Sequence, residues 1–158
     1  MAKTLREQVI GTWSLVSYQS TDKDGNVVYP LGKDAKGFIM YNPDGYMSAQ
    51  IMAAGRPAYQ SGDLHTGTQE EMAAAAHGYL AYSGRFEVNE QKQELTHHMD
   101  VSMNPTWLDQ AQPRIAKLDG NVVVIFNGLK PEDKLTWKRV EKNGSQHSLE
   151  NRRLVLAN

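Results

Sequence analysis

The chain has 158 residues, and its 17 basic and 18 acidic side chains give a formal net charge of −1 at pH 7. A nearly neutral chain has no overall field that attracts nucleic acid or an anionic membrane surface. Its length predicts a single domain over residues 1–158. The lack of cysteine excludes disulfides and thiolate metal sites. No run of residues approaches transmembrane length and no apolar segment follows Met1, so we expect a cytoplasmic protein without a membrane partner.

The first third of the chain indicates a short helix followed by strands. Thr4 with Glu7 three residues later is the spacing of a capping box, which predicts one helical turn. Pro43 and Gly45 suit the second and fourth positions of a type I turn between two strands. The strands expected here cover residues 11–20, 38–41 and 46–53.

One longer helix is expected after the Gly/Pro-rich loop at residues 54–63. Thr68 and Glu71 form a second capping box, and the alanine run at residues 73–76 has high helix propensity. His77 suits the last turn and Gly78 suits the stop.

The rest of the chain again has the pattern of strands. Asp119-Gly120 is a strong signal for a hairpin with a two-residue loop, so a strand is expected on each side of it. The other strands expected here cover residues 79–88, 94–103 and 134–141. The tail at residues 148–158 fits a short helix or a strand equally well. About eight antiparallel strands with hairpin links predict an up-and-down barrel with one helical insertion, which can hold one small ligand. A β-sandwich is the alternative.

Several segments resemble a known family. Gly11-Thr12-Trp13 resembles the G-x-W opening of the lipocalin barrels, in which the tryptophan closes the barrel floor beneath a basic residue of the last strand. Arg139 is the matching basic residue, and Lys138 is the other choice. The further segments that carry the resemblance are residues 11–18, 44–50, 82–86 and 96–107.

Together these segments are similar to the bacterial and fungal lipocalin-like domain family over nearly the whole chain. The resemblance implies an all-β, eight-stranded lipocalin-like barrel. It implies little about activity, because most members have none assigned, although some fungal relatives accompany natural-product pathways.

The adjacent histidines His97 and His98 are the most informative site residues. Neighbouring residues of a strand point to opposite faces of the sheet. The face with His97 is otherwise apolar, so we expect His97 to face the barrel interior and His98 to face solvent. A buried neutral imidazole can orient a carbonyl or hydroxyl, or move a proton. The alternative is that His97 only bonds a buried tyrosine or backbone group.

A metal site is not expected. His97 and His98 point apart, and His98 with Asp100 supplies only two ligands where zinc needs three or four. No motif for a nucleotide cofactor or a serine nucleophile is present. We therefore expect neither metal nor cofactor.

Other side chains are expected to complete a ligand site. Tyr82 can offer a hydroxyl, Trp107 follows a turn signal at one barrel end, and Arg114 can pair with an anionic ligand. Methionines suit irregular apolar ligands. The predicted ligand-binding residues are Met47, Gln50, Tyr82, Phe86, His97, Met99, Val101, Trp107 and Arg114.

These features support three functional hypotheses. The leading one is binding of a small apolar or amphipathic molecule in the barrel. The second is an isomerase or cyclase acting on a polyketide- or terpenoid-like intermediate, with His97 as acid/base and Tyr82 orienting the substrate. The third is a partner-binding or structural module with a closed barrel and an exposed apolar patch. The ligand and the oligomeric state are left open by the sequence.

Overall fold

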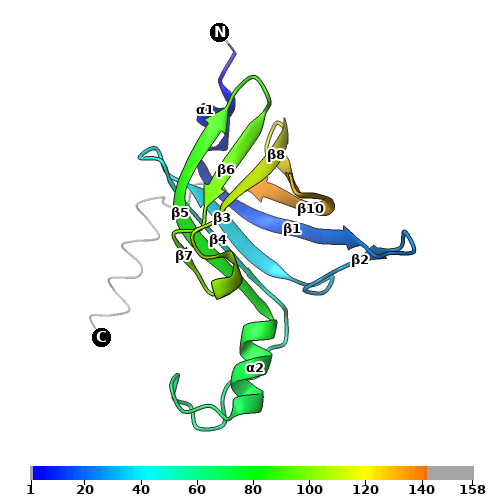
Figure 1. The fold of residues 1–158 in the computed structure, drawn as a ribbon, viewed down its shortest axis with the longest axis vertical. Coiled ribbons are helices and arrows are strands. Elements are labelled where there is room, and N and C mark those ends of the chain that lie inside the picture. The colour runs from blue at the N-terminus through cyan, green and yellow to red at the C-terminus, as the bar shows by residue number, and fades with distance from the viewer. Residues whose placement is uncertain (1, 142–158) are drawn as a thin grey trace.

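The computed structural model describes residues 2–141, and its main feature is a closed antiparallel barrel (Figure 1). Eight strands form the wall: β1 (Gly11–Thr21), β3 (Lys36–Tyr41), β4 (Tyr46–Met52), β5 (Tyr79–Asn89), β6 (Glu94–His98), β8 (Ala111–Asp119), β9 (Val122–Asn127) and β10 (Lys130–Arg139). Two short strands lie beside the wall: β2 (Val27–Val28) pairs with β1 and β7 (Val101–Ser102) pairs with β5. The predicted eight-stranded barrel is confirmed.

Closure of the sheet follows from the pairing of its first and last strands. The strands lie in the order β10-β9-β8-β6-β5-β4-β3-β1, and β10 then pairs with β1 from Gln19↔Lys134 to Trp13↔Arg139. No barrel strand is left with a long unpaired edge, which is how barrels avoid edge-to-edge association. The alternative of an open sandwich is therefore wrong.

One end of the barrel is closed by helix α1 (Leu5–Val9). Thr4 caps it as predicted, accepting a hydrogen bond from the Glu7 backbone N–H. Leu5 and Val9 are buried against the core, and Trp13 beside them is fully buried.

A basic residue covers Trp13, as the resemblance to lipocalins implied. The Arg139 guanidinium lies 4.1 Å from the centroid of the Trp13 ring. Its Nη1 donates to the Ile10 carbonyl at 2.9 Å and its Nη2 donates to the Gln8 carbonyl. Arg139 is thus the stacked residue, and Lys138 is exposed.

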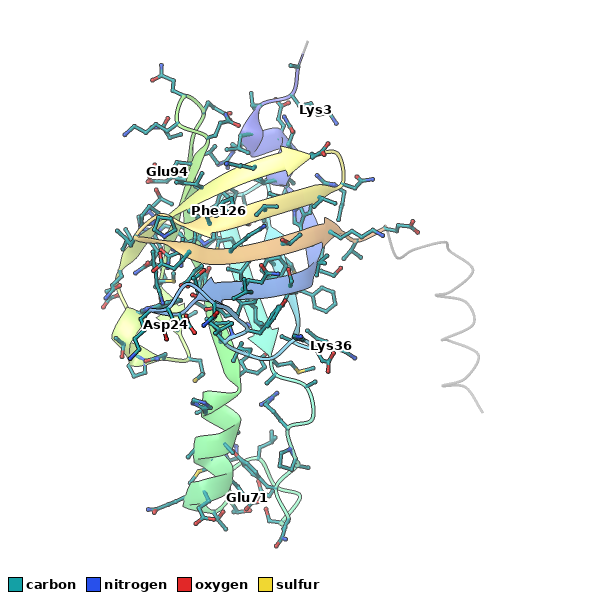
Figure 2. All side chains as sticks on the ribbon, turned by 90° about the vertical axis from the view of Figure 1, so that its right-hand side faces the viewer. Lys3, Asp24, Lys36, Glu71, Glu94 and Phe126 are labelled. Carbon is teal, nitrogen blue, oxygen red and sulfur yellow. The ribbon has the colours of Figure 1, made fainter. Side chains whose placement is uncertain are left out.

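Helix α2 (Gln69–His77) projects from the end opposite α1 (Figure 1). Thr68 and Glu71 make the predicted capping box, and Gly78 ends the helix. Figure 2 shows Glu71 far from the barrel, and none of the α2 residues is buried. The helix and the loop before it therefore flank the barrel end at which β4 ends and β5 begins.

Strand bounds differ from prediction by one or two residues at several ends and by more at two places. The strand expected over residues 94–103 ends at His98, where the Asp100 N–H turns back to bond the His98 carbonyl, and Val101–Ser102 form the separate strand β7. The last strand begins at Lys130, four residues before its expected start at Lys134. The tail at residues 148–158 lies outside the described residues.

Candidate functional site

A small cavity of about 40 Å³ lies inside the barrel. Most of its wall is apolar, with aliphatic side chains from β3, β4, β5, β9 and β10. The residues that line it are Tyr18, Ile39, Ala49, Ile51, Leu80, Tyr82, His97, Trp107, Arg114, Ile125, Asn127, Asp133, Leu135 and Trp137. An apolar wall with a few polar groups is the usual composition of a small-molecule site.

His97 lies at the centre of a buried hydrogen-bond network. Its Nε2 lies 2.7 Å from the Tyr41 hydroxyl and its Nδ1 lies 3.0 Å from the Tyr82 hydroxyl. Burial lowers the pKa of His97 well below its ordinary value, and the charge of Arg114 lowers it further. Burial also raises the pKa of both tyrosines. The imidazole and the two phenols are therefore neutral together at pH 7.

Arg114 brings a positive charge into the same interior. It is only 6% exposed. Its Nη1 donates to the Pro113 carbonyl at 2.9 Å and makes longer contacts with Asn127 Oδ1 at 3.3 Å and Gln112 Oε1 at 3.4 Å. No carboxylate among residues 2–141 lies within ion-pair distance of its guanidinium. The protein thus buries a cation without a direct counter-ion, which is costly unless a partner is supplied.

The other polar groups of the cavity come from β1 and β10. Asp133 accepts a hydrogen bond from the Ser20 hydroxyl at 2.5 Å, and Lys130 lies 3.6 Å from the same oxygen. Burial raises the pKa of Tyr18, and the negative charge of Asp133 raises it further. The carboxylate is therefore already engaged by neighbours of its own.

Trp107 separates this cavity from a second one of about 80 Å³. Trp107 ends the short 3₁₀ helix η1 (Pro105–Trp107), and both cavities are lined by Trp107 and Leu80. Its ring lies edge-on to Tyr82 at 5.8 Å and beneath the Arg114 guanidinium at 5.9 Å.

The predicted site residues fall into three groups. His97, Tyr82, Trp107 and Arg114 line the cavity together, although they come from different elements. Met47, Phe86 and Met99 are buried in the core and do not line it. Gln50 and Val101 lie on the outside of the barrel.

The outward positions correct the prediction for two residues. Gln50 lies on the outer face of β4, where its side chain accepts a hydrogen bond from the Tyr79 hydroxyl at 2.6 Å. Val101 is 62% exposed, because the strand break after His98 ends the alternation that placed it inside with His97 and Met99. His98 faces outward as expected, and its Nε2 lies 3.5 Å from Glu87 Oε2.

Sequence reasoning missed several polar residues of the interior. Trp13 faces inward, so strict alternation along β1 would turn Tyr18 outward. A bulge between Leu15 and Ser17 shifts the phase and brings Tyr18 inside. Asp133 was missed because the last strand begins earlier than expected, although it alternates regularly with Trp137 and Arg139.

Residues 2–141 contain no group of three or more histidine, aspartate or glutamate side chains placed to hold a metal ion. Within this same part of the chain, no helix has both the length and the apolar character needed to cross a membrane.

Comparison with known proteins reveals one informative relative. A 4'-hydroxy-3'-methoxypropiophenone carrier protein of Aspergillus oryzae is 30% identical to this chain over 109 residues. That alignment covers 61% of this chain and 98% of the carrier protein. A carrier relative supports binding of a small molecule as the general activity of this barrel.

Two solved structures match this chain at low sequence identity. The lipoprotein YedD of Klebsiella pneumoniae is 12% identical with a TM-score of 0.38, over 92% of this chain and 83% of that one. A DUF4847-family protein of Bacteroides vulgatus is 10% identical with a TM-score of 0.43, over 85% of this chain and 96% of that one. The family model of the lipocalin-like domain matches residues 10–152, and the chain therefore belongs to that family.

Proposed function

We propose that this protein binds a small amphipathic aromatic molecule in the barrel, at the cavity beside His97. The observation that carries the proposal is the convergence of Tyr82, His97 and Arg114 on a cavity whose wall is otherwise apolar. Such a site suits a ligand with a flat apolar body and one or two oxygen atoms. The carrier relative supports the same class, since its named ligand is an aryl ketone with hydroxyl and methoxy groups.

The ligand must enlarge the cavity in order to enter. About 40 Å³ has room for a few water molecules, whereas ligand pockets begin at roughly 300 Å³. Trp107 stands between this cavity and the adjoining one, on a 3₁₀ turn rather than on a barrel strand. We therefore expect the Trp107 ring to swing aside and then to pack against the bound aromatic body.

Calorimetric titration with 4'-hydroxy-3'-methoxypropiophenone tests the proposal. Saturable binding with one site per chain is expected, together with a change in tryptophan fluorescence. In Trp107→Phe the fluorescence change should be largely lost while calorimetry still detects binding. Val101→Ala is the matched control, because it removes apolar surface outside the barrel and should bind as the wild type does. Absence of saturable binding by this compound and by related aryl ketones contradicts the proposal.

The hydrogen-bond network also supports a second function, an isomerase or cyclase. A neutral imidazole bridging two phenols is a chain along which a proton can move, and Tyr82 presents that chain to the cavity. In this function His97 would serve as acid/base and Tyr82 would orient a carbonyl. Both ring nitrogens already have partners, so a proton must reach the substrate through the Tyr82 hydroxyl.

Deuterium exchange at the carbon next to the ketone tests the second function. An active protein in D₂O would exchange these protons of the aryl ketone faster than buffer does, as followed by NMR. His97→Gln should then abolish exchange and leave binding within about twofold of wild type. Exchange at the buffer rate in the wild-type protein, despite saturating ligand, contradicts an enzymatic role toward this ligand class.

A further inference from the structure

We propose that the cavity selects a ligand whose oxygen is ionised, and that the Tyr82 hydroxyl and the Arg114 guanidinium hold that oxygen between them. The inference rests on the small-molecule binding proposed above and names the charge state of the ligand. Tyr82 and Arg114 are 7% and 6% exposed, and both line the cavity. A phenolate is the first candidate, and a carboxylate offers the same chemistry.

The hydrogen-bond network assigns the tautomer of His97. Among residues 2–141, Tyr41 has His97 as its hydrogen-bond partner and no other, and it does not line the cavity. If Tyr41 accepted a proton from Nε2, its own O–H would be buried without an acceptor, which costs about 1–3 kcal/mol. Tyr41 therefore donates to Nε2, and the imidazole proton lies on Nδ1.

This tautomer leaves the Tyr82 proton free for a ligand. The protonated Nδ1 of His97 donates to the Tyr82 oxygen at 3.0 Å. The Tyr82 O–H must then donate elsewhere, and no acceptor for it occurs among the described residues. Because Tyr82 lines the cavity, its hydroxyl is a buried donor aimed at whatever occupies that space.

Arg114 adds a charge that the fold does not neutralise. Its polar contacts are a backbone carbonyl and two side-chain amide oxygens, all of them uncharged. Burial raises the pKa of Tyr82, and the positive charge of Arg114 opposes that rise. The cation and the free phenol donor thus lie together, as a site for a negatively charged oxygen requires.

The balance of donors and acceptors favours the same ligand. The indole N–H of Trp137 is buried without a hydrogen-bond partner among residues 2–141, and Trp137 lines the cavity. Asn127 Oδ1 already accepts hydrogen bonds from Arg114 and from the Leu129 N–H. Asp133 Oδ1 is bound by Ser20 and Lys130. The Trp137 N–H and the Tyr82 O–H remain as donors without an acceptor among the described residues, so the ligand is expected to accept hydrogen bonds from them.

The three tyrosines and His97 near Arg114 stay uncharged near neutral pH. The titratable groups that line the cavity are Tyr18 on β1, Tyr82 on β5, His97 on β6 and Asp133 on β10. Tyr41 on β3 contacts His97 from behind the cavity wall, and His98 lies on the outer face of β6. Burial raises the pKa of the three tyrosines from 10.0 and lowers that of His97 from 6.5. Between these values the three tyrosines and His97 stay neutral, so their ionisation does not contribute a pH dependence of affinity.

The experiment compares three probes by calorimetry from about pH 6.5 upward. The first is 4'-hydroxy-3'-methoxypropiophenone, the second is its methyl ether, and the third is 3,4-dimethoxybenzoate. If the ionised oxygen is bound, the affinity of the phenol rises about tenfold per pH unit up to its own pKa. The ether should bind more weakly and without pH dependence. Tight, pH-independent binding of the benzoate also supports the inference and identifies a carboxylate as the preferred anion.

Two variants locate the effect. Arg114→Gln should weaken phenol binding by about 10- to 100-fold and flatten its pH dependence, while the ether binds as before. Lys117→Gln is the matched control, since it removes the same charge from the exposed outer face of β8 and should leave the pH dependence intact. Tyr82→Phe provides a second variant, with an expected loss of about tenfold for the phenol. Unfolding curves verify that each variant is folded.

The outcomes separate this inference from the proposed function. Binding of the phenol and the ether with equal affinity at every pH overturns the inference and leaves small-molecule binding in place. A wild-type pH dependence in Arg114→Gln also overturns it. Failure of all three probes to bind contradicts the proposed function and the inference together.

Discussion

Two arginines of the barrel strands, Arg114 buried and Arg139 half-buried, have opposite surroundings. Arg139, at the end closed by α1, stacks on Trp13 and donates to the carbonyls of Gln8 and Ile10. Arg114, beside the cavity, has one short hydrogen bond to a carbonyl and two longer contacts with amide oxygens. The fold supplies Arg139 with carbonyl acceptors and an aromatic ring, whereas it supplies Arg114 with weaker contacts and no carboxylate among residues 2–141.

The same difference holds for two buried tryptophans. Trp13 donates its indole N–H to the Val9 carbonyl at 2.9 Å, whereas the N–H of Trp137 has no partner among the described residues. One end of the barrel therefore has the hydrogen bonding of a finished core. The region around the cavity has hydrogen-bond donors without partners, as expected where a protein departs from ideal packing at a binding site.

The strongest effect is expected at the α1 end. Trp13→Ala removes a fully buried ring together with its hydrogen bond and its contact with Arg139. Deletions of this kind lower the free energy of unfolding by about 3–5 kcal/mol. Urea denaturation measures the loss, with Val101→Ala as a control expected to stay within about 0.5 kcal/mol of wild type. A loss under about 1 kcal/mol for Trp13→Ala would show that this end is not core.

The next effect compares the arginines directly. Arg139→Gln should lower the free energy of unfolding by about 2–3 kcal/mol, because it breaks charge-assisted hydrogen bonds to two carbonyls. Arg114→Gln should stay within about 1 kcal/mol of wild type, since relief of an unpaired buried charge offsets the removal of its hydrogen bonds. Equal losses of stability in the two variants would remove the distinction between the ends.

A smaller difference in the free energy of unfolding is expected between variants of the two tryptophans. Trp13→Phe and Trp137→Phe lose the same atoms, but only the first leaves a buried carbonyl, that of Val9, without its donor. We expect Trp13→Phe to be the less stable by about 1–2 kcal/mol. Chemical denaturation of both variants under identical conditions checks the order, and the reverse order would mean that the Trp137 N–H has a partner in solution.

The weakest effect concerns the pH dependence of stability. The pKa of His97 is lowered in the folded protein from 6.5, so below that pH the unfolded chain binds more protons. The contribution of His97 to the free energy of unfolding is therefore fully present above about pH 6.5. Below that pH it falls by at most about 1.4 kcal/mol for each pH unit of acidification. His97→Asn should reduce the slope between about pH 6.5 and 5, where carboxylates contribute little. Identical slopes would contradict a neutral buried imidazole.

Much of the fold could be predicted from local sequence. The N-cap at Thr4, the capping box at Thr68 and the turn at Asp119-Gly120 involve short-range chemistry and occur in the structure. Of the full capping box predicted at Thr4, the structure has the hydrogen bond from the Glu7 N–H to the Thr4 hydroxyl. Trp13 and Arg139 were paired through a family resemblance rather than through any local rule. Strand alternation correctly placed His97 inside and His98 outside.

The cavity was less predictable because it depends on irregularities of the strands. The bulge in β1 that turns Tyr18 inward and the break after His98 that turns Val101 outward are set by pairing with distant strands. Alternation counted along one strand has no information on such shifts. Tyr41 was missed for a different reason, since its role follows from contact with His97, 56 residues away in the chain.

The two arginines thus have separate roles, because Arg114 is placed to serve the ligand and Arg139 serves the fold. The gain in unfolding free energy on adding 4'-hydroxy-3'-methoxypropiophenone, at a pH at which its phenol is ionised, tests this division. A ligand at 100 times its Kd stabilises the folded state by about 2.7 kcal/mol. We predict that wild type and Arg139→Gln gain this amount equally, although the variant starts from a lower stability, and that Arg114→Gln gains little. Equal gains in all three proteins would contradict the division of roles.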